Sequence, residues 1–541
     1  MKGLLDKRAK PNQYKHSSWL AMIESRVKMA NSFLKDNAAL CCAIDDLEMA
    51  YLQNTLDSVL GFENRLGNLV IEIKPSGRTN DKYLATSHEY ILFYAKSHEN
   101  ASVDFFPLSE EQIEQYKEGD GGESFKWRDF LRTGGTSTPD VRPNSFYPIF
   151  YDPKSGKAAL ESFAGAIKIL PVDSEGKNRV WRKTPPSFIK HLVSGEINFK
   201  QNKKGDYKVQ IIDKIKSGTR PKSVWVGAKY DASSHGTKLL KSIFGESLSF
   251  SFPKSINAVF DTIYINSSSA PESLILDFFS GSGTTGHAVI SLNREDAGRR
   301  KYILVEQGEY FDTVTKPRIQ KIVYSADWKD GKPTSPESGV SHAFKVLKLE
   351  SYEDTLNNLE LRRTQAQQHL LDTLPAAVQE EYLLRYMLNI ESQGSNLSVA
   401  SFKKPFDFKL KITVDSAGAF EERPIDLVET FNYLIGLRIK SIDSLRERGI
   451  VMVQGVLPTG EKTLVIWRDM DRVDYETLNK FCETQSINPK DSEFEVVYIN
   501  GDHNIPAVLM TTAEEGGITR SLKLRQIEPE FLSRMFAGEG V

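Results

Sequence analysis

The chain has few cysteines and no long apolar segment. Only three of its 541 residues are cysteine, and their positions (Cys41, Cys42 and Cys482) match neither a disulfide framework nor a set of metal ligands. No apolar run reaches the ~20 residues of a membrane helix, and no apolar core follows the charged first residues to make a secretion signal. We therefore expect a cytoplasmic protein with idle thiols, no metal and no membrane contact.

The chain also lacks a marked net charge. The formal charge is −2 at pH 7, and 40% hydrophobic with 26% charged residues is typical of a globular protein. Residues 199–222 are a local exception, because they hold eight lysines and arginines against two aspartates. Such charge favours DNA binding, since each neutralised phosphate releases counterions, although a solvated loop is the alternative. The candidate phosphate contacts are Lys200, Lys203, Lys204 and Lys208.

Apolar periodicity before residue 97 indicates an α/β region. It predicts a helix at 17–35, a fully buried strand as in a parallel sheet at 38–45, a helix at 45–61, and strands at 64–74 and 88–96. Alternating strands and helices are typical of an α/β sheet. Residues 97–220 mix turn formers, aromatics and charges without a sustained period. We interpret them as an irregular insertion.

The α/β pattern returns after the insertion. It predicts helices at 236–245 and 255–266, a strand at 274–279, a helix from Thr285 and a strand at 300–307. After a polar stretch, it predicts a helical segment at 360–391, a helix at 424–437, a hairpin of 449–457 with 460–468, and a strand at 494–500. We divide the chain into residues 1–96, 97–220, 221–327, a linker at 328–341 and a second α/β domain at 342–541.

A glycine-rich turn is the clearest candidate site. Gly281, Gly283 and Gly286 form G-x-G-x-x-G directly after a strand and at the start of a helix, where glycines allow a tight turn and close approach by a ligand. Glu306 ends the next strand, where an acid can accept hydrogen bonds from ribose hydroxyls. A nicotinamide-dependent oxidoreductase and a purely structural turn both remain alternatives. A P-loop is excluded, because no G-K-[ST] follows the glycines, and no catalytic His/Lys/Tyr set accompanies them.

The residues around the turn favour one family over these alternatives. The stretch DFFSGSGTTGHAV (277–289) resembles the S-adenosylmethionine motif of amino-methylating DNA methyltransferases. The chain looks most similar to the modification subunit of type III restriction–modification systems. Further similar stretches occur in the order of that family, among them YKHSSWLAMIESRVKMANSFL, HGTKLLKSIFG, FSFPKSINAVFD and GEKTLVIWR. Target recognition before the glycine loop is the permuted order of that class.

The resemblance implies a fold, a cofactor and a reaction. The fold would be a permuted, Rossmann-like class I methyltransferase sheet with an inserted target-recognition region (97–220) and a C-terminal α/β assembly domain. The reaction would be methylation of adenine N6 in DNA, and a restriction helicase–nuclease subunit is a candidate partner. The residues implied to contact S-adenosylmethionine are Asp277, Phe278, Phe279, Ser280, Gly281, Ser282, Gly283, Thr284, Thr285, Glu306, Phe252, Pro253 and Lys254.

The catalytic signature of that family is absent. Such enzymes flip the target adenine out of the duplex and hold it with a [DNS]-P-P-[YFW] loop, which lies upstream of the helix that begins near His16. TPPSF (184–188) has the two prolines but neither flanking residue. We expect that the chain starts downstream of the signature, and that residues 1–13 are too charged and turn-rich to replace the buried central strand before it. We therefore assign no catalytic residue to this chain.

Two hypotheses follow from this absence. In the first, a second methyltransferase polypeptide supplies the strand and the loop, since a sheet without its central strand leaves buried backbone groups unpaired at ~1–3 kcal/mol each. In the second, the chain is a non-catalytic DNA- or cofactor-binding subunit, or a truncated remnant. The sequence identifies neither the recognition site nor the oligomeric state.

Overall fold

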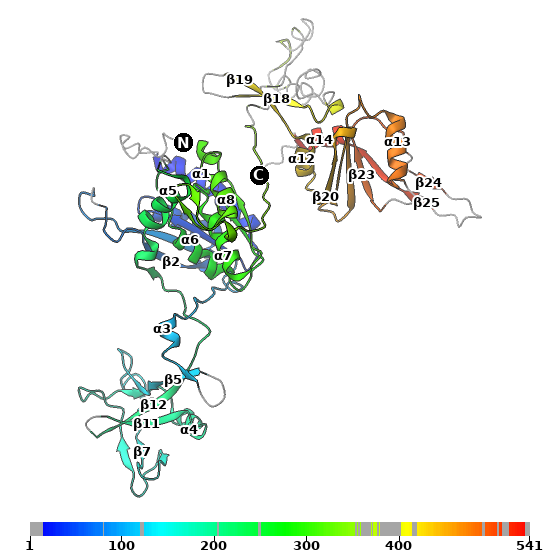
Figure 1. Ribbon diagram of the computed structural model, residues 1–541. Coiled ribbons are helices and arrows are strands. Elements are labelled where there is room, and N and C mark those ends of the chain that lie inside the picture. The colour runs from blue at the N-terminus through cyan, green and yellow to red at the C-terminus, as the bar shows by residue number, and fades with distance from the viewer. Residues whose placement is uncertain are drawn as a thin grey trace. The chain divides into compact units, whose positions relative to one another are not determined.

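The computed structural model of the protein is shown in Figure 1. It describes residues 15–351 apart from 79–80, 119–123, 203–204 and 247–249, and residues 402–535 apart from 414–418, 489–492, 506–507 and 511–518. Between these two ranges it describes only residues 354, 358, 369, 372–375 and 378. The chain divides into two compact units, Met1–Ala343 and Phe344–Val541.

The first unit contains a four-stranded sheet with the order β1-β3-β2-β13. Its strands are β1 (Ala39–Ile44), β2 (Arg65–Glu72), β3 (His88–Ala95) and β13 (Val224–Trp225). β3 is antiparallel to both β1 and β2, whereas β13 is parallel to β2. The two predicted helices of this region are present as α1 (Lys15–Phe33) and α2 (Met49–Leu60).

Helices cover both faces of this sheet. α1 and α2 pack on one face, where Val27 and Leu56 lie in one cluster with Leu92 of β3. On the other face, α6 (Ile256–Ser267) contributes Ala258 to a cluster that includes Phe93 of β3. Successive residues of β3 therefore point into two different cores, as the alternation of a strand requires.

The structure corrects the prediction of a fully buried strand in a parallel sheet at 38–45. β1 is antiparallel to its neighbour, and none of its residues is fully buried. A short apolar run indicates burial but does not tell the direction of the neighbouring strand. β1 also pairs with β3 alone among the described residues, so its second edge has no strand partner there.

A separate pair of parallel strands carries the glycine motif. β14 (Leu274–Asp277) pairs with β15 (Lys301–Leu304), and Asp277 lies opposite Leu304. α7 (Thr284–Asp296) and α8 (Thr315–Tyr324) cover one face of the pair. The other face is open: Leu274, Leu276, Ile303 and Val305 are 37–62% exposed.

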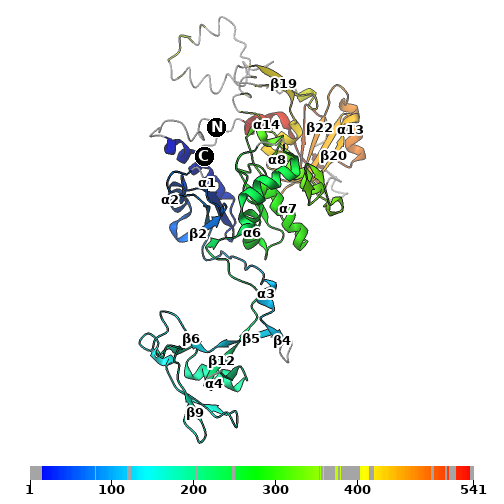
Figure 2. The same cartoon turned by 60° about the vertical axis from the view of Figure 1, so that its left-hand side comes forward.

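α6 packs against both the four-stranded sheet and the β14–β15 pair. Its Ile265 belongs to the core with β2 and β3, whereas its Ile263 packs with Ala288 of α7 and Ile275 of β14. Figure 2 shows α6 beside α7. Within the described residues no strand joins β14 to β1, so the two sheets share a covering helix but no hydrogen-bond ladder.

The inserted region has strands and a core of its own. Phe130, Trp181, Phe188 and Ile211 are buried together there. One sheet has the antiparallel order β11-β12-β5-β4. These strands were not predicted from the sequence. Many are only two or three residues long, which is too short to produce a sustained apolar period. The elements are α3 (Glu110–Ile113), β4 (Lys117–Glu118), β5 (Ser124–Asp129), β6 (Leu131–Arg132), β7 (Ile149–Tyr151), β8 (Ala158–Ala159), β9 (Ile167–Ile169), β10 (Val180–Trp181), α4 (Pro185–Val193), β11 (Ile197–Gln201) and β12 (Tyr207–Lys214).

The stretch 328–341, which was expected to be a linker, contains a hairpin of β16 (Trp328–Lys329) and β17 (Lys332–Pro333). Its Trp328 and Val340 pack against the core between α7 and α8. The ammonium of Lys321 lies 4.0 Å from the Trp328 ring centre. The predicted helix at 236–245 forms a π-helix, Ser233–Lys238, followed by α5 (Leu239–Phe244).

The second unit is built on a mixed five-stranded sheet. The strands are β20 (Arg438–Leu445), β21 (Ile450–Val456), β22 (Lys462–Arg468), β23 (Val496–Ile499) and β26 (Lys523–Gln526), in that order across the sheet. The predicted hairpin is confirmed as β21 and β22, and β22, β23 and β26 run parallel. Two further pairs are β18 (Lys409–Thr413) with β19 (Phe420–Pro424), and β24 (Val508–Met510) with β25 (Thr519–Ser521).

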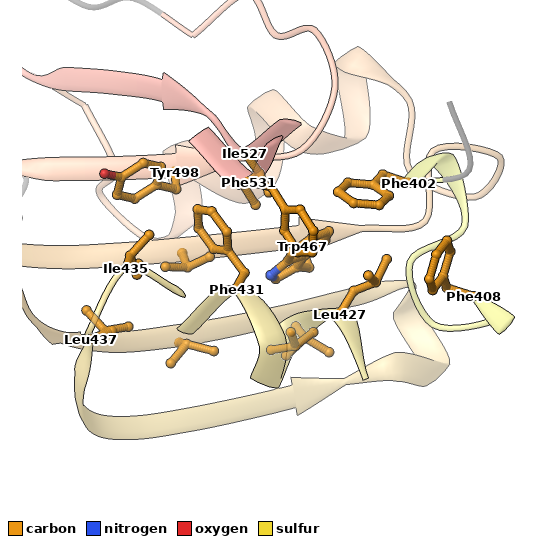
Figure 3. Packing of buried hydrophobic residues seen from close by; sticks show 14 of the residues in the cluster. Phe402, Phe408, Leu427, Phe431, Ile435, Leu437, Trp467, Tyr498, Ile527 and Phe531 are labelled. Atoms are coloured by element: carbon orange, nitrogen blue, oxygen red, sulfur yellow. The ribbon is translucent and has the colours of Figure 1, made fainter. Parts of the chain in front are cut away.

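Helices cover both faces of this second sheet as well. α12 (Leu427–Leu434) and α14 (Ile527–Met535) lie on one face, where Phe431 and Phe531 surround Trp467 (Figure 3). α13 (Tyr475–Thr484) lies on the other and buries Cys482. The long helical stretch predicted at 360–391 falls almost entirely outside the described residues. Among the helices that are described, none combines the length and the apolar composition needed to span a membrane.

Candidate functional site

The glycine-rich turn needs each of its three glycines for a physical reason. Gly281 and Gly283 have φ of +53° and +78°, the left-handed region in which other residues are strained. A Cβ on Gly286 would lie 2.6 Å from Cδ1 of Ile319 and 2.9 Å from Cδ1 of Leu304. The first two glycines therefore make the turn, and the third lets α7 pack closely against α8 and β15.

The predicted acids hold the turn from two neighbouring strand ends. The Asp277 carboxylate accepts hydrogen bonds from the N–H of Phe279 at 3.1 Å and the hydroxyl of Thr285 at 2.5 Å. The Glu306 carboxylate accepts from the N–H of Gly281 at 2.8 Å, and it also accepts from two N–H groups of the turn that follows β15. A carboxylate has about four acceptor positions, and the Tyr310 hydroxyl also hydrogen-bonds this carboxylate, so a ligand hydroxyl would bind Glu306 by replacing that of Tyr310.

A buried arginine supports the turn from below. Arg318 of α8 is fully buried and donates from Nη1 to the hydroxyls of Ser282 and Thr284, both at 2.9 Å. Its guanidinium also donates to Nδ1 of His287 at 3.1 Å. Burial lowers the pKa of Arg318 to about 9, so the group stays charged at neutral pH. Burial and the charge of Arg318 hold the pKa of His287 well below its usual value, so this imidazole is neutral.

A second segment approaches the turn from the side. The ring of Phe250 packs edge-to-face on Tyr310 with centroids 4.9 Å apart, and it lies 3.9 Å from the position of a Cβ on Gly281. Phe252 is 89% exposed and has φ of +57°, an unfavourable conformation for an aromatic residue. A Cβ on Gly236 would lie only 2.6 Å from the carbonyl oxygen of Pro253, so that glycine permits the close backbone passage.

The predicted residues of this segment line a cavity of about 570 Å³ on the four-stranded sheet. Phe252, Pro253 and Lys254 line it together with Glu89 and Tyr90 of β3. Lys254 forms an ion pair with Glu89. Asp277 and the glycines do not line this cavity, so the predicted cofactor residues fall into two neighbouring groups, with Phe250 between them.

Two buried hydroxyls are unsatisfied, one in each group. Oγ of Ser280, in the glycine turn, and Oγ of Ser255, beside Lys254, have no hydrogen-bond partner among the described residues. An unsatisfied buried polar group costs ~1–3 kcal/mol, and a bound polar ligand would remove that cost. The volume of the cavity also falls within the ~300–1,000 Å³ of small-molecule sites.

Some of the remaining residues of the site were predicted from the sequence, and others were not. Phe278 and Phe279 follow Asp277 with ring centroids 5.2 Å apart. Phe250, Thr315 and Arg318 were not predicted from the sequence, although the Thr315 hydroxyl donates to the carbonyl of Gly281 at 2.6 Å. A signal for Arg318 existed, because on α8 it lies four residues before Ile322, which is buried on the same face of the helix.

The candidate DNA contacts are only partly described. Lys200 of β11 and Lys208 of β12 are exposed and lie directly opposite one another in the hairpin register. Lys203 and Lys204 lie outside the described residues. No group of three or more His, Cys, Asp or Glu side chains that could hold a metal occurs in the described part of the chain.

Comparison with known proteins identifies the family. Residues 5–316 match the model of the DNA methylase family, N6_N4_Mtase. The chain is 31% identical over 307 residues to the type II methyltransferase M.KpnI of Klebsiella pneumoniae, covering 56% of this chain and 70% of that protein. It is 28% identical over 357 residues to the EcoPI Mod subunit of a type III restriction–modification enzyme from Escherichia phage P1, covering 61% of this chain and 53% of that subunit.

These similarities cover only part of this chain and only part of each related protein. The EcoP15I Mod subunit of Escherichia coli is 24% identical over 325 residues, which cover 54% of this chain and 47% of the subunit. The chain thus spans about half the length of these type III subunits. A solved structure of a DNA modification methylase from Thermus thermophilus, complexed with S-adenosylmethionine, aligns over 57% of this chain and 80% of its own with 12% identity and a TM-score of 0.26. The family match extends over more than half of the chain, which therefore belongs to the DNA methylase family.

Proposed function

We propose that the chain is the S-adenosylmethionine-binding, DNA-recognising subunit of a site-specific DNA adenine-N6 methyltransferase. A second polypeptide supplies the central strand and the D-P-P-Y-type loop. The observation that carries this proposal is the interruption between β1 and β14. Each strand has one paired edge in the described residues, and the helix α6 packs under both.

The residues of the glycine turn fit S-adenosylmethionine. Ser280 has a buried hydroxyl without a partner among the described residues, and the positive φ of Gly281 lets the backbone turn closely at this point. Glu306 accepts from a ribose hydroxyl at the one acceptor position that its three backbone bonds leave, in place of the Tyr310 hydroxyl. When bound, the cofactor supplies a methyl group activated on a sulfonium. Asp277 orients the turn, and Lys254 contributes a positive charge for the carboxylate of the methionine end.

The interruption in the sheet fits a donated strand. An added strand between β1 and β14 would pair two backbone edges, each unpaired group costing ~1–3 kcal/mol when buried. The segment around this strand would also cover the open face of β14 and β15, where Leu274 and Ile303 are 62% and 46% exposed. Covering apolar surface stabilises the assembly by about 25 cal/mol per Å².

The donated loop would supply the chemistry that these residues lack. In the 541 residues the one Pro-Pro pair is Pro185-Pro186. It begins α4 in the recognition region, after Thr184, so it serves as a helix start. An adenine amine needs an acceptor side chain, a neighbouring carbonyl and an aromatic surface for the extruded base. The proposal places all three on the partner, close to the end of β14.

The proposal also assigns the other regions. Residues 97–220 recognise the target, with Lys200, Lys203, Lys204 and Lys208 as phosphate contacts, and residues 342–541 serve assembly. A restriction helicase–nuclease subunit is a candidate for binding there, because several similar proteins are named Mod subunits of type III enzymes.

The test is co-expression of the chain with a polypeptide that carries a strand followed by D-P-P-[YFW]. Methyl transfer from labelled S-adenosylmethionine to DNA is measured, and the product nucleoside is identified. N6-methyladenine is expected only when both chains are present, and it should disappear when the Asp of the partner's motif is changed to Ala. If the chain binds the cofactor but no partner polypeptide restores methylation, the chain is instead a non-catalytic subunit. Full activity of residues 1–541 alone would refute the proposal.

A further inference from the structure

One face of the recognition-region sheet carries a row of polar side chains. In β12, Val209 and Ile211 point into the buried core, so Gln210 between them points to the opposite face. Gln210 lies directly opposite Asn198 of β11 on one side and Asp129 of β5 on the other. The three side chains therefore form a row across three neighbouring strands, because directly opposed residues share a face.

A groove of about 790 Å³ runs along this face. Asn198, Gln210 and Lys200 line it, together with Phe125 and Trp127 of β5. Trp127 is 38% exposed and packs edge-to-face on Phe125, with ring centroids 5.6 Å apart. The groove thus combines amides, a lysine and an apolar wall in one open surface.

The two amides are arranged as a joint donor and acceptor. Nδ2 of Asn198 donates to Oε1 of Gln210 at 3.2 Å. That bond does not use the carbonyl oxygen of Asn198 or the NH₂ group of Gln210, which leaves one acceptor beside one donor. The major-groove edge of adenine presents the complement, an N6 amine that donates and an N7 atom that accepts.

Charge divides this face into two parts. Lys200 and Lys208 lie opposite each other two residues along the hairpin from the amide pair, and both are exposed. Asp129 ends the polar row on β5, where the Arg182 guanidinium donates to its backbone carbonyl at 2.7 Å and lies close to its carboxylate. The lysine end therefore suits the DNA backbone, whereas the amide row suits base edges. β11 is the edge strand of this four-stranded sheet, so the sheet presents the β11–β12 hairpin at its edge, and the major groove admits two such strands.

We propose that the β11–β12 hairpin, at the edge of the recognition-region sheet, reads DNA in the major groove, with Asn198 and Gln210 together specifying one adenine of the recognition sequence. Lys200 and Lys208 hold the flanking phosphates. Trp127 forms the apolar wall against which a thymine methyl packs. This inference rests on the proposed function, because it assumes that DNA is the substrate.

The experiment is selection of DNA from a pool with a random central segment by the complete complex, followed by sequencing of the bound fraction. The wild-type complex is expected to select a motif that contains a specified A·T pair. The double variant N198A/Q210A should lose the specification of that pair alone and bind the selected site about 5- to 150-fold more weakly. Gln210→Glu, which keeps the shape and replaces the donor with an acceptor, should also lose that adenine and serves if the double variant fails to fold.

The lysine pair has a different expected signature. K200A/K208A should weaken binding to pool DNA of every sequence and reduce the slope of log affinity against log salt by about 1.8, with the motif unchanged. K168A/K190A is the matched control, because Lys168 and Lys190 are exposed in the same region but lie on β9 and α4. It should leave the affinity nearly unchanged.

The outcomes separate this inference from the proposed function. An identical motif from wild type and from both amide variants overturns the inference, and so does a wild-type complex that selects no motif. If such a complex still methylates adenine, the proposed function stands without the inference. A complex that neither binds S-adenosylmethionine nor methylates, but loses one specified adenine in Gln210→Glu, supports the inference and removes the proposed function.

Discussion

Arg318 and His287 are hydrogen-bonded to each other in a fully buried position beneath the glycine turn. The guanidinium donates to Nδ1 of His287, which requires a neutral imidazole. Arg318 also binds Ser282 and Thr284, so one side chain on α8 links the turn to the first helical residues after it. The predicted cofactor turn is therefore held by a charged group that neither contacts solvent nor has a carboxylate partner among its described contacts.

This arrangement predicts a pH dependence of stability. Because the pKa of His287 is lowered in the folded chain, the unfolded chain binds more protons below its usual pKa of about 6.5. The contribution of His287 to stability is thus complete above that pH and is lost as the pH falls, by at most about 1.4 kcal/mol per pH unit. The measurement is the free energy of unfolding between pH 7.5 and 5 for wild type and for His287→Asn.

The variant should show a shallower slope than the wild type over this range. The comparison isolates His287, because His342, whose pKa is also lowered, is present in both proteins. Equal slopes would contradict the neutral, buried imidazole.

The close packing of Gly286 predicts a stability loss on substitution. A methyl group there would clash with Ile319 and Leu304. Gly286→Ala should therefore destabilise the first unit by about 1–3 kcal/mol, as other overpacked sites do. Chemical denaturation of the full chain measures this loss. Gly135→Ala is the control, since a Cβ at that position would meet no atom within 4 Å, and an equal loss in both variants would contradict the packing account.

The three backbone bonds of Glu306 predict that the charge of this side chain matters more than its size. Glu306→Gln keeps the shape but turns an NH₂ group toward N–H donors of Gly281 or of residues 307 and 308. Affinity for S-adenosylmethionine should fall about 10- to 100-fold, in line with the loss of charged hydrogen bonds. Calorimetric titration of the complex provides the measurement. Glu309→Gln, at an exposed neighbour, should leave the affinity intact; unchanged affinity in Glu306→Gln would remove this residue from the proposed site.

The elements with strong periodicity were predictable from the sequence. The helix predicted at 17–35 is Lys15–Phe33, and the glycine turn stands between a strand and a helix as its motif indicates. The direction of β1 was not predictable, because an apolar run carries no information on which strand lies beside it. The roles of Arg318 and Phe250 likewise depend on contacts between segments that are distant in the sequence.

The recognition region shows the same limit. A cluster of lysines is visible in the sequence at 200–208, but the opposition of Lys200 and Lys208 depends on the register of a hairpin. The pairing of Asn198 with Gln210 depends on that register too, and a shift of one residue would turn both amides toward the core.

The most direct test of the proposed strand donation is hydrogen exchange of the backbone amides of β1 and β14, with and without a D-P-P-Y-bearing partner. Strands β20 to β22 of the second unit serve as the internal reference. The account predicts fast exchange for part of Ala39–Ile44 and Leu274–Asp277 in the chain alone, and strong slowing in the complex. Full protection of both strands in the chain alone, unchanged by the partner, would contradict the account.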